Sequence, residues 1–420
     1  LFGYERPTTP NLERWFGDEV AAIYERSYST EAATAPSVVS FLSGLLPQEH
    51  RVRLLHQMVP ETTRILPDLL PDSYETAAFV SNAVLADEAI GIGDRFDHYD
   101  DFVDEIEPNR PVFERNAGRT TEAVLAWMRQ REDASRPLFL WVHYIDPHGP
   151  YMPPPEWELR YSHPEPRMID PRRIPFYSRI GDDVDGLAYV DRYDEEITYT
   201  DHEVGRLLDG LNEQITGGLD EALVLFTADH GESMMDHESW FTHGYHVYEE
   251  IVRVPLMVRG LAAGVVPGRT TSPVSGVDVV PTLLGAARVE APESVKGADL
   301  RNLPIMQPDR VVLIEASDNY RQVRALVRRN HKVLAGVSPE GEITGWGLID
   351  LETDPGEIEW APLVTAARLR ATLEEMIRRD PDPGGLPSQY AEGAKLTGPK
   401  VAPGVDGVQL DRLRALGYVD

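Results

Sequence analysis

The chain of 420 residues contains no cysteine and only four lysines. The absence of cysteine excludes disulfide bonds. Basic residues are also outnumbered. The chain has 40 basic and 70 acidic residues, which gives a net charge of −30. That charge disfavours nucleic acids and anionic membrane surfaces as partners. No apolar run is long enough to span a bilayer, so the sequence predicts no membrane span in these 420 residues. Its length and composition agree with a large α/β enzyme.

One apolar run ends abruptly in residues that can bind metal. Residues 224–226 read as a buried strand, and Asp229, His230 and Gly231 follow shortly after it. Open α/β sheets bind ligands at the carboxyl ends of their strands. A carboxylate beside an imidazole favours a divalent transition metal, manganese or zinc, over calcium, which prefers oxygen ligands. The alternative is that this triplet is only a strand-to-loop turn.

A second motif lies near the beginning of the chain. Thr34 and Ser37 flank Pro36, and an apolar segment follows that closes on Gly44. A hydroxyl residue just before a proline at the start of a helix reads as a nucleophile, because the free N–H groups there favour anions. Thr34 could instead simply cap the helix.

Together these segments resemble the sulfatase-like branch of the alkaline phosphatase superfamily, whose nucleophile motif is Cys, Ser or Thr followed by x-Pro-Ser. Matching segments recur in the family's order over nearly the whole chain. They are residues 3–12, 34–47, 139–151, 193–208, 224–232, 254–258, 277–284, 348–357 and 413–418. The resemblance implies an alkaline-phosphatase-like, mostly parallel sheet flanked by helices, followed by a small C-terminal antiparallel subdomain.

The resemblance also implies roles for individual residues. Thr34 holds the nucleophile position and joins Asp229 and His230 as a ligand of a divalent metal ion. His148 and His243 would contact the transferred group or protonate the leaving group, and Asn82 and Ser37 would bind substrate. These seven residues form the predicted site.

Other polar residues in the matching segments have simpler interpretations. His148 could be a loop histidine that bonds to backbone carbonyls. His143 lies at the end of a strand and is expected to pack. Asp194 and Asp201 fall on one face of a helix, where a solvated or capping role is expected.

Two departures from the family pattern bear on metal binding and chemistry. The chain opens at Leu1 without the strand that carries two acidic metal ligands in relatives, so we expect a fragment, an incomplete sheet and weak metal binding. Sulfatases use a formylglycine made from Cys as the nucleophile, and an Arg follows it shortly. This chain has Thr34 at the position of that Cys and Val38 at the position of that Arg. Asn82 lies where relatives carry a Gly-Lys-x-His motif. The four lysines, all outside the catalytic segments, are Lys296, Lys332, Lys395 and Lys400.

These substitutions predict a metal-dependent hydrolase or transferase of sulfate or phosphate esters that does not use formylglycine. Phosphorus esters are slightly preferred, because a threonine sulfate would be a stable ester needing a separate hydrolytic step. The substrate is a small-molecule, glycan or lipid ester. Two alternatives remain: a true sulfatase in which Thr34 replaces Cys, and a noncatalytic protein of this fold that binds an anionic glycan or partner.

Composition along the chain predicts two parts, a catalytic α/β domain over residues 1–295 and a smaller α+β subdomain over 296–420. A helix is expected at 122–131 and a strand at 138–143. Residues 151–191, rich in Pro, Arg and Asp, are expected to form a surface excursion near the active site. Residues 380–407, rich in Pro and Gly, are expected to be a mobile loop. The sequence indicates neither the oligomeric state nor the localisation.

Overall fold

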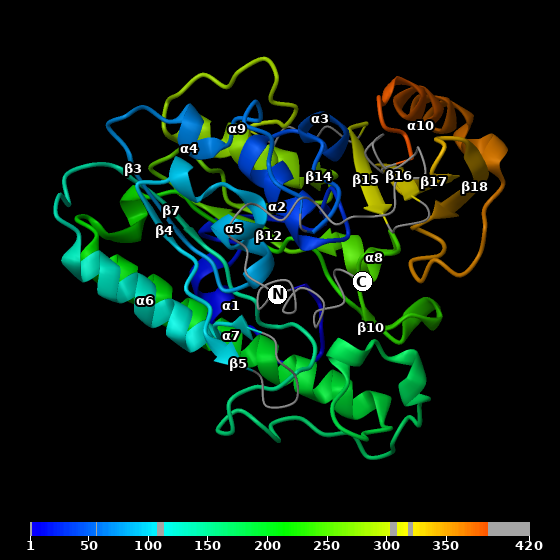
Figure 1. Ribbon diagram of the computed structural model, residues 1–420, viewed down its shortest axis with the longest axis horizontal. Helices are drawn as coiled ribbons and strands as arrows, with labels where there is room; N and C mark the ends of the chain where they lie inside the picture. Colours follow the sequence, from blue (N-terminus) through cyan, green and yellow to red (C-terminus); the bar gives the residue numbers. More distant parts are fainter. Residues whose placement is uncertain (1, 56, 107–112, 303–308, 318–321, 385–420) are drawn as a thin grey trace.

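The computed structural model describes the chain except for residues 1, 56, 107–112, 303–308, 318–321 and 385–420. It consists of an α/β body and a C-terminal antiparallel sheet beside it (Figure 1). This confirms the predicted fold class. None of the helices in the described part has the length and apolar character needed to cross a bilayer.

Two sheets form the centre of the α/β body. One has the order β4-β3-β7 and is parallel throughout, and the other has the order β13-β1-β12-β8, with β12 antiparallel to both neighbours. The strands are β1 (Ala21–Tyr24), β3 (Glu75–Phe79), β4 (His98–Asp100), β7 (Leu138–Val142), β8 (Val224–Thr227), β12 (Leu256–Arg259) and β13 (Gly268–Thr270). The runs of β7 and β8 are almost continuously apolar, as is typical of strands with helices on both faces.

Helices cover both faces of these sheets (Figure 1). One layer packs on strands of both sheets and contains α1 (Pro10–Phe16), α6 (Ala117–Gln130) and α7 (Gly186–Gln214). The opposite layer contains α2 (Thr34–Ser43), α4 (Leu66–Leu69) and α9 (Val279–Ala286). The predicted helix at 122–131 begins earlier, because Asn116 caps α6 by accepting a hydrogen bond from Arg119 N.

The predicted excursion at 151–191 is wrong for its last six residues, which belong to α7. Asp185 accepts a hydrogen bond from Leu187 N and thereby caps that helix. The cap was missed because the apolar periodicity of the helix becomes regular only further along the chain. The excursion therefore ends at Asp185.

Shorter elements surround the sheets and complete the α/β body. The paired strands are β2 (Ser27–Tyr28), β11 (Arg253–Val254) and β14 (Val274–Ser275) in one sheet, β5 (Glu105–Ile106) with β6 (Phe113–Glu114), and β9 (Ser233–Met234) with β10 (Trp240–Thr242). The short helices are α3 (Pro47–His50), α5 (Asp87–Ile90) and α8 (Glu249–Val252). The 3-10 turns include η1 (Ala83–Leu85), which follows Asn82, and η4 (Phe176–Ser178), which contains Tyr177.

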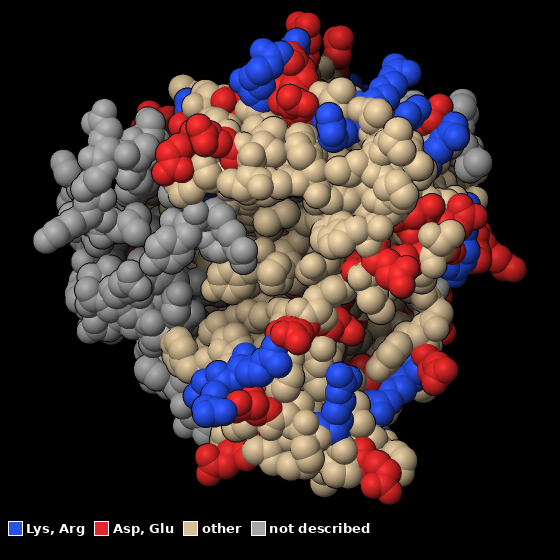
Figure 2. Space-filling model, turned by 90° about the vertical axis from the view of Figure 1, so that its right-hand side faces the viewer, with Lys and Arg blue, Asp and Glu red and all other residues tan. Residues whose placement is uncertain are grey.

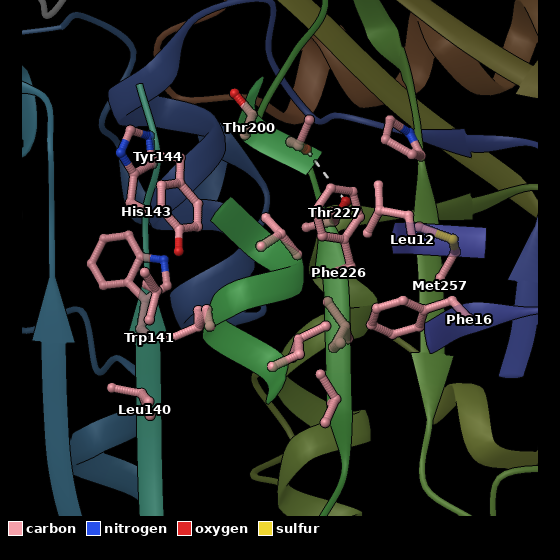
Figure 3. Close-up of a pocket in the computed structure, with 18 of the residues that line it drawn as sticks. Leu12, Phe16, Leu140, Trp141, His143, Tyr144, Thr200, Phe226, Thr227 and Met257 are labelled. Atoms are coloured by element: carbon pink, nitrogen blue, oxygen red, sulfur yellow. Dashed lines mark hydrogen bonds between the residues drawn. The ribbon is translucent and has the colours of Figure 1, made fainter. Parts of the chain in front are cut away.

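An open space separates the two sheets, and we call it the slot. Among the described residues, β7 pairs only with β3 and β8 pairs only with β12, so each strand has one open edge. Residues of both strands line one cavity of about 1560 Å³ (Figure 3). All residues of β7 and β8 are partly exposed, whereas β3 and β12 are mostly buried.

The C-terminal sheet is four-stranded and antiparallel, as predicted. Its strands are β15 (Val311–Ser317), β16 (Gln322–Arg328), β17 (His331–Val337) and β18 (Ile343–Asp350). One face packs on α10 (Ala367–Arg379), and the other packs on Tyr28, Ile251 and neighbouring residues of the α/β body. The predicted loop at 380–407 lies outside the described residues from 385 onward, and the division at residue 295 stays a prediction.

Charged side chains of both signs occupy the surface. On the face drawn in Figure 2 they lie mainly around the rim, and the hollowed centre shows uncharged residues. Inside the molecule, Asp194 and Asp201 of α7 are buried rather than solvated. Asp194 is buried and accepts hydrogen bonds from Tyr4 Oη and Arg6 Nη1, both at 2.7 Å. Asp201 caps a neighbouring helix, accepting from Asn11 N at 2.8 Å and Leu12 N at 2.8 Å.

Hydrogen exchange should reveal the open edges of the slot. We expect amides of β7 and β8 to exchange faster than those of β3 and β12, because the latter two strands are paired along both edges. Exchange followed by mass spectrometry, with β3 and β12 as internal controls, measures this difference. Equal protection of all four strands would show that the slot is filled.

Removing the helix cap should weaken the fold. We expect Asp201→Ala to lower the free energy of unfolding by about 1–2 kcal/mol, because it leaves two buried N–H groups of α1 without an acceptor. Asp209→Ala is the matched control on the same helix, since Asp209 pairs with Arg14 while both side chains are 50% exposed. That pair should contribute about 0.5 kcal/mol or less. Urea denaturation measures both, and equal effects would contradict the capping role.

Candidate functional site

Six of the seven predicted site residues line one pocket and come from separate elements, whereas Ser37 of α2 is not part of the lining. Thr34 is the first residue of α2, and Asp229 and His230 follow β8 directly. Asn82 follows β3 and His148 follows β7, so strands of both sheets contribute. His243 comes directly after β10 and completes the set. The pocket lies where β3, β7 and β8 end, the position at which α/β sheets bind ligands.

Figure 3 shows how the slot leads along the strands that carry the site. Leu140, Trp141 and His143 come from β7 and the residue after it on one side. Phe226 and Thr227 come from β8 on the other side. The site therefore bridges the two sheets at one end of the slot.

Thr34 and His230 form the central contact of the site. Thr34 Oγ1 lies 3.2 Å from His230 Nε2, while His230 Nδ1 lies 2.8 Å from the carbonyl oxygen of Gly231. A carbonyl only accepts, so Nδ1 carries the proton and Nε2 has a lone pair that can accept from the Thr34 hydroxyl. That hydroxyl has one proton and donates either to His230 or to Asp229. Burial lowers the pKa of His230, which keeps the ring neutral. Ala33 is the N-cap residue of α2 and Thr34 is the first helical residue, so the alternative capping role of Thr34 is wrong.

Asp229 lies between two imidazoles and the threonine. Burial acts to raise its pKa, but His230, His143 and a hydrogen bond from Thr34 outweigh burial and leave the pKa below its ordinary value. Burial lowers the pKa of His143, and the carboxylate opposes that effect. The sequence analysis treated His143 as a packing residue. The structure brings it close enough to Asp229 for each to influence the other's pKa.

Ser37 and Asn82 are both buried and engaged with backbone groups. Ser37 Oγ donates to the carbonyl oxygen of Asp229 at 2.6 Å, which ties α2 to the turn after β8. Because a hydroxyl has one proton, Ser37 could only accept a hydrogen bond from a substrate while this contact persists. Asn82 Oδ1 accepts from Val84 N at 3.0 Å, leaving its Nδ2 as the possible donor. Substrate binding by both residues stays a prediction.

His243 belongs to a buried chain of polar groups. Its Nδ1 lies 3.3 Å from Glu232 Oε1, and Glu232 Oε2 accepts a hydrogen bond from Tyr151 Oη at 2.6 Å. Burial would raise the pKa of Glu232, but His243 and the other partners hold it below the ordinary value. The rings of His243 and His230 stack with centroids 4.3 Å apart. Glu232 had no predicted role, although it lies only two residues beyond His230.

The excursion contributes an aromatic ring to the site. Tyr177, in η4, stacks on His148 with ring centroids 6.1 Å apart and meets the edge of His243 at 6.3 Å. Its hydroxyl lies 3.1 Å from Thr242 Oγ1. The excursion thus lies beside the site, as expected, and Tyr177 helps to hold both histidines. No sequence motif marks Tyr177, because the contact joins segments far apart in the chain.

Gly231 is required by a close approach of two backbones. A Cβ atom at this position would lie 2.3 Å from the carbonyl oxygen of Glu250. Gly231 N donates to the carbonyl oxygen of Ile251. The turn that carries Asp229 and His230 is therefore pressed against the segment leading into β11.

The predicted metal site is incomplete within the described part of the chain. Asp229 Oδ2 and His230 Nε2 are 3.5 Å apart, but no group of three His, Asp or Glu side chains is arranged to hold a metal ion in the described ranges. Catalytic zinc sites typically have three protein ligands. These residues alone do not fit a full metal site, and the reaction proposed below routes no step through an ion.

Comparisons with known proteins agree with the fold and the motifs. A family model described as Sulfatase matches residues 1–289. The choline-sulfatase of Rhizobium meliloti is 32% identical over 254 residues, which cover 55% of this chain and 47% of that protein. The chain spans about half the length of the first curated relatives it matches.

Two solved structures share the fold at low sequence identity. The phosphonate monoester hydrolase SpPMH from Silicibacter pomeroyi has a TM-score of 0.68 and 19% identity, covering 89% of this chain and 91% of that chain. BT4656, solved with its substrate D-glucosamine-2-N,6-O-disulfate, has a TM-score of 0.70 and 19% identity, covering 90% of this chain and 94% of that chain. Identity this low shows the shared fold alone.

Adding a methyl group at Gly231 should displace the turn of the site. We expect Gly231→Ala to lower the free energy of unfolding by about 1–3 kcal/mol, because the backbone of Glu250 cannot move aside as a flexible side chain would. Gly345→Ala is the control, since a Cβ atom there meets nothing within 4 Å. Its effect should stay within about 0.5 kcal/mol. Thermal and urea unfolding measure both, and equal stabilities would contradict the close approach.

Proposed function

Because this chain belongs to the sulfatase family, we propose that it hydrolyses or transfers esters of sulfate or phosphate with Thr34 as the nucleophile. The observation that carries this proposal is the 3.2 Å contact between Thr34 Oγ1 and His230 Nε2, with the tautomer set by Gly231. A hydroxyl within hydrogen-bond reach of an oriented base is the arrangement that activates a nucleophile. Thr34 also lies at the amino end of α2, which favours an anionic substrate.

The reaction has two steps. The Thr34 hydroxyl gives its proton to His230 Nε2 while Oγ1 forms a bond to the sulfur or phosphorus atom. The bond from that atom to the leaving-group oxygen breaks, and the oxygen takes a proton from His148 or His243. Water, or an acceptor hydroxyl, then attacks the Thr34 ester while giving a proton back to His148 or His243. The bond to Thr34 Oγ1 breaks, and Oγ1 takes back the proton held by His230 Nε2.

Phosphorus esters suit this site slightly better than sulfate esters. Without cysteine no formylglycine can be made from Cys, and a threonine sulfate would resist release. Among the described residues no lysine lines the pocket, since Lys296 and Lys332 pair with glutamates elsewhere. A site with few permanent cations favours a monoanionic diester over a dianionic monoester.

The organic group of the substrate would lie against the excursion that carries Tyr177. Esters of small molecules, of glycans and of lipids all fit the proposal. One structural neighbour was solved with a sulfated glucosamine, and another is a phosphonate monoester hydrolase. These neighbours support an ester of sulfate or phosphorus without selecting the group attached to it.

A noncatalytic role is the second candidate function. The observations that favour it are the absence of cysteine, Val38 at the position where relatives carry Arg, and the absence of lysine from the pocket lining among the described residues. A protein of this kind would bind an anionic glycan in the same pocket and leave it intact. Binding of a sulfated disaccharide without turnover, measured by calorimetry, would distinguish it from the enzyme.

Removing the nucleophile should abolish turnover. We expect Thr34→Ala to reduce kcat/KM for the preferred ester by ~10³-fold or more, whereas Thr34→Ser keeps the hydroxyl and retains measurable activity. Matched aryl sulfate, phosphate monoester and phosphate diester substrates, assayed with manganese and zinc present, would identify the ester class. Turnover that is unchanged in Thr34→Ala would contradict the proposal.

Metal binding can be tested without any substrate. Members of the sulfatase family typically use a divalent metal ion, and we propose manganese or zinc with Asp229, His230 and Thr34 as ligands. An ion on His230 Nε2 would replace that nitrogen as the group that activates the Thr34 hydroxyl. We expect this chain to bind the metal ion weakly. The Asp229→Asn variant should lose that binding, and the control variant Asp236→Asn should keep it unchanged. Titration calorimetry with each metal chloride measures this. Tight binding, or binding indifferent to Asp229→Asn, would contradict the assignment.

A further inference from the structure

A buried cluster of charged groups lies between the α/β body and the C-terminal sheet. Glu315 of β15 accepts from Arg53 Nε at 2.9 Å, and Asp380 accepts from Arg53 Nη2 and Arg324 Nη2, both at 2.5 Å. Glu31 completes the cluster from the α/β side. Glu31, Glu315 and Arg324 are 0% exposed, Arg53 is 5% exposed and Asp380 is 6% exposed.

Glu31 is the member of this cluster whose charge is not balanced. No side chain in the described part of the chain donates a hydrogen bond to its carboxyl oxygens, and only the backbone N–H groups of Ala32 and Ser317 face them. Three carboxyl groups face two guanidinium groups, so the cluster carries one excess negative charge if all three are ionised. An unpaired charge in a buried site is costly, and a proton on Glu31 removes it.

The backbone around Glu31 joins the C-terminal sheet to the segment that leads into Thr34. Glu315 N donates to Thr30 O at 2.8 Å, and Ala32 N donates to Glu315 O at 3.2 Å. These bonds form a parallel bridge between Glu31 and Glu315. Helix α2 begins with Thr34 only three residues after Glu31. The position of Thr34 therefore depends on how this bridge is held.

We propose that Glu31 is a positioning residue, which in its neutral form keeps the bridge to β15 closed and holds Thr34 beside His230, and on ionisation opens the bridge. The part of this inference that concerns activity rests on the proposed function. The part that concerns the bridge does not, because it can be followed in the folded protein without any substrate.

The direction of the pH effect follows from burial. Burial, and then the neighbouring Glu315, raise the pKa of Glu31 well above its ordinary value, while Arg53 and the N–H groups of Ala32 and Ser317 oppose this without outweighing it. The folded chain then holds a proton that the unfolded chain releases above a pH of about 4.3. Stability from this group is present below that pH and falls as the pH rises toward the raised pKa.

The test compares wild type with Glu31→Gln, which keeps the shape and removes the titration. Over the window above a pH of about 4.3, the unfolding equilibrium constant of wild type should rise by up to about tenfold per pH unit more than that of the variant. Glu122→Gln, on the exposed surface of α6, serves as the control and should follow wild type. The same pH dependence in wild type and Glu31→Gln would overturn the proposal.

Hydrogen exchange supplies the second measurement and needs no variant. In wild type, protection of the amides of Ala32 and Glu315, corrected for intrinsic exchange, should fall as the pH rises through this window. Protection that stays constant would overturn the role of the bridge, even if Glu31→Gln failed to fold.

Turnover supplies the third measurement. The alkaline decline of kcat/KM in wild type should be reduced in Glu31→Gln, and an unchanged decline would overturn the link to Thr34. Absence of turnover in every variant would count against the proposed function alone, because stability and exchange would still decide the role of Glu31.

Discussion

The contact between Gly231 and the backbone of Glu250 is the constraint on which the site depends. It fixes the turn that follows β8, and the turn fixes the carbonyl group that selects the tautomer of His230. That tautomer leaves Nε2 able to accept a proton from Thr34. The base is thus oriented by backbone groups rather than by a carboxylate side chain, and its geometry follows directly from how closely two chain segments can approach.

The site is also assembled across a divided sheet. Helix α2 packs on the β3 side of the slot, whereas Asp229 and His230 follow β8 on the other side. The hydrogen bond from Ser37 to Asp229 and the contact between Thr34 and His230 join these two halves. A third group, the pair of Glu232 and His243, is held by Tyr151 and by the excursion. Each group of the site is positioned by a different part of the fold.

Local patterns in the sequence predict most of the elements and only part of the site. The apolar runs of β7 and β8 and the turn at Asp229 are visible because their signal lies within a few residues. The same is true of the motif around Thr34 and Pro36. The family resemblance then places His148 and His243.

What escaped prediction are the contacts between distant segments. The contacts of Tyr177 with His148 and of Tyr151 with Glu232 depend on tertiary packing, and no local pattern encodes them. A capping role was among those expected for Asp201, but the helix that it caps could not be predicted. The beginning of α7 was misplaced for a related reason, since its cap precedes the periodic part of the helix. Burial, which decides the state of Glu31, can be read only from the assembled fold.

The slot has a mechanical consequence. Between β7 and β8 no backbone hydrogen bond resists sliding in the described part of the chain, so the two sheets are coupled through the helices that pack across them. Sliding of one sheet past the other is then opposed by side-chain packing rather than by backbone hydrogen bonds in the described ranges. The contact between Thr34 and His230 joins α2 on one sheet to the turn after the other, so it would lengthen with such a slide.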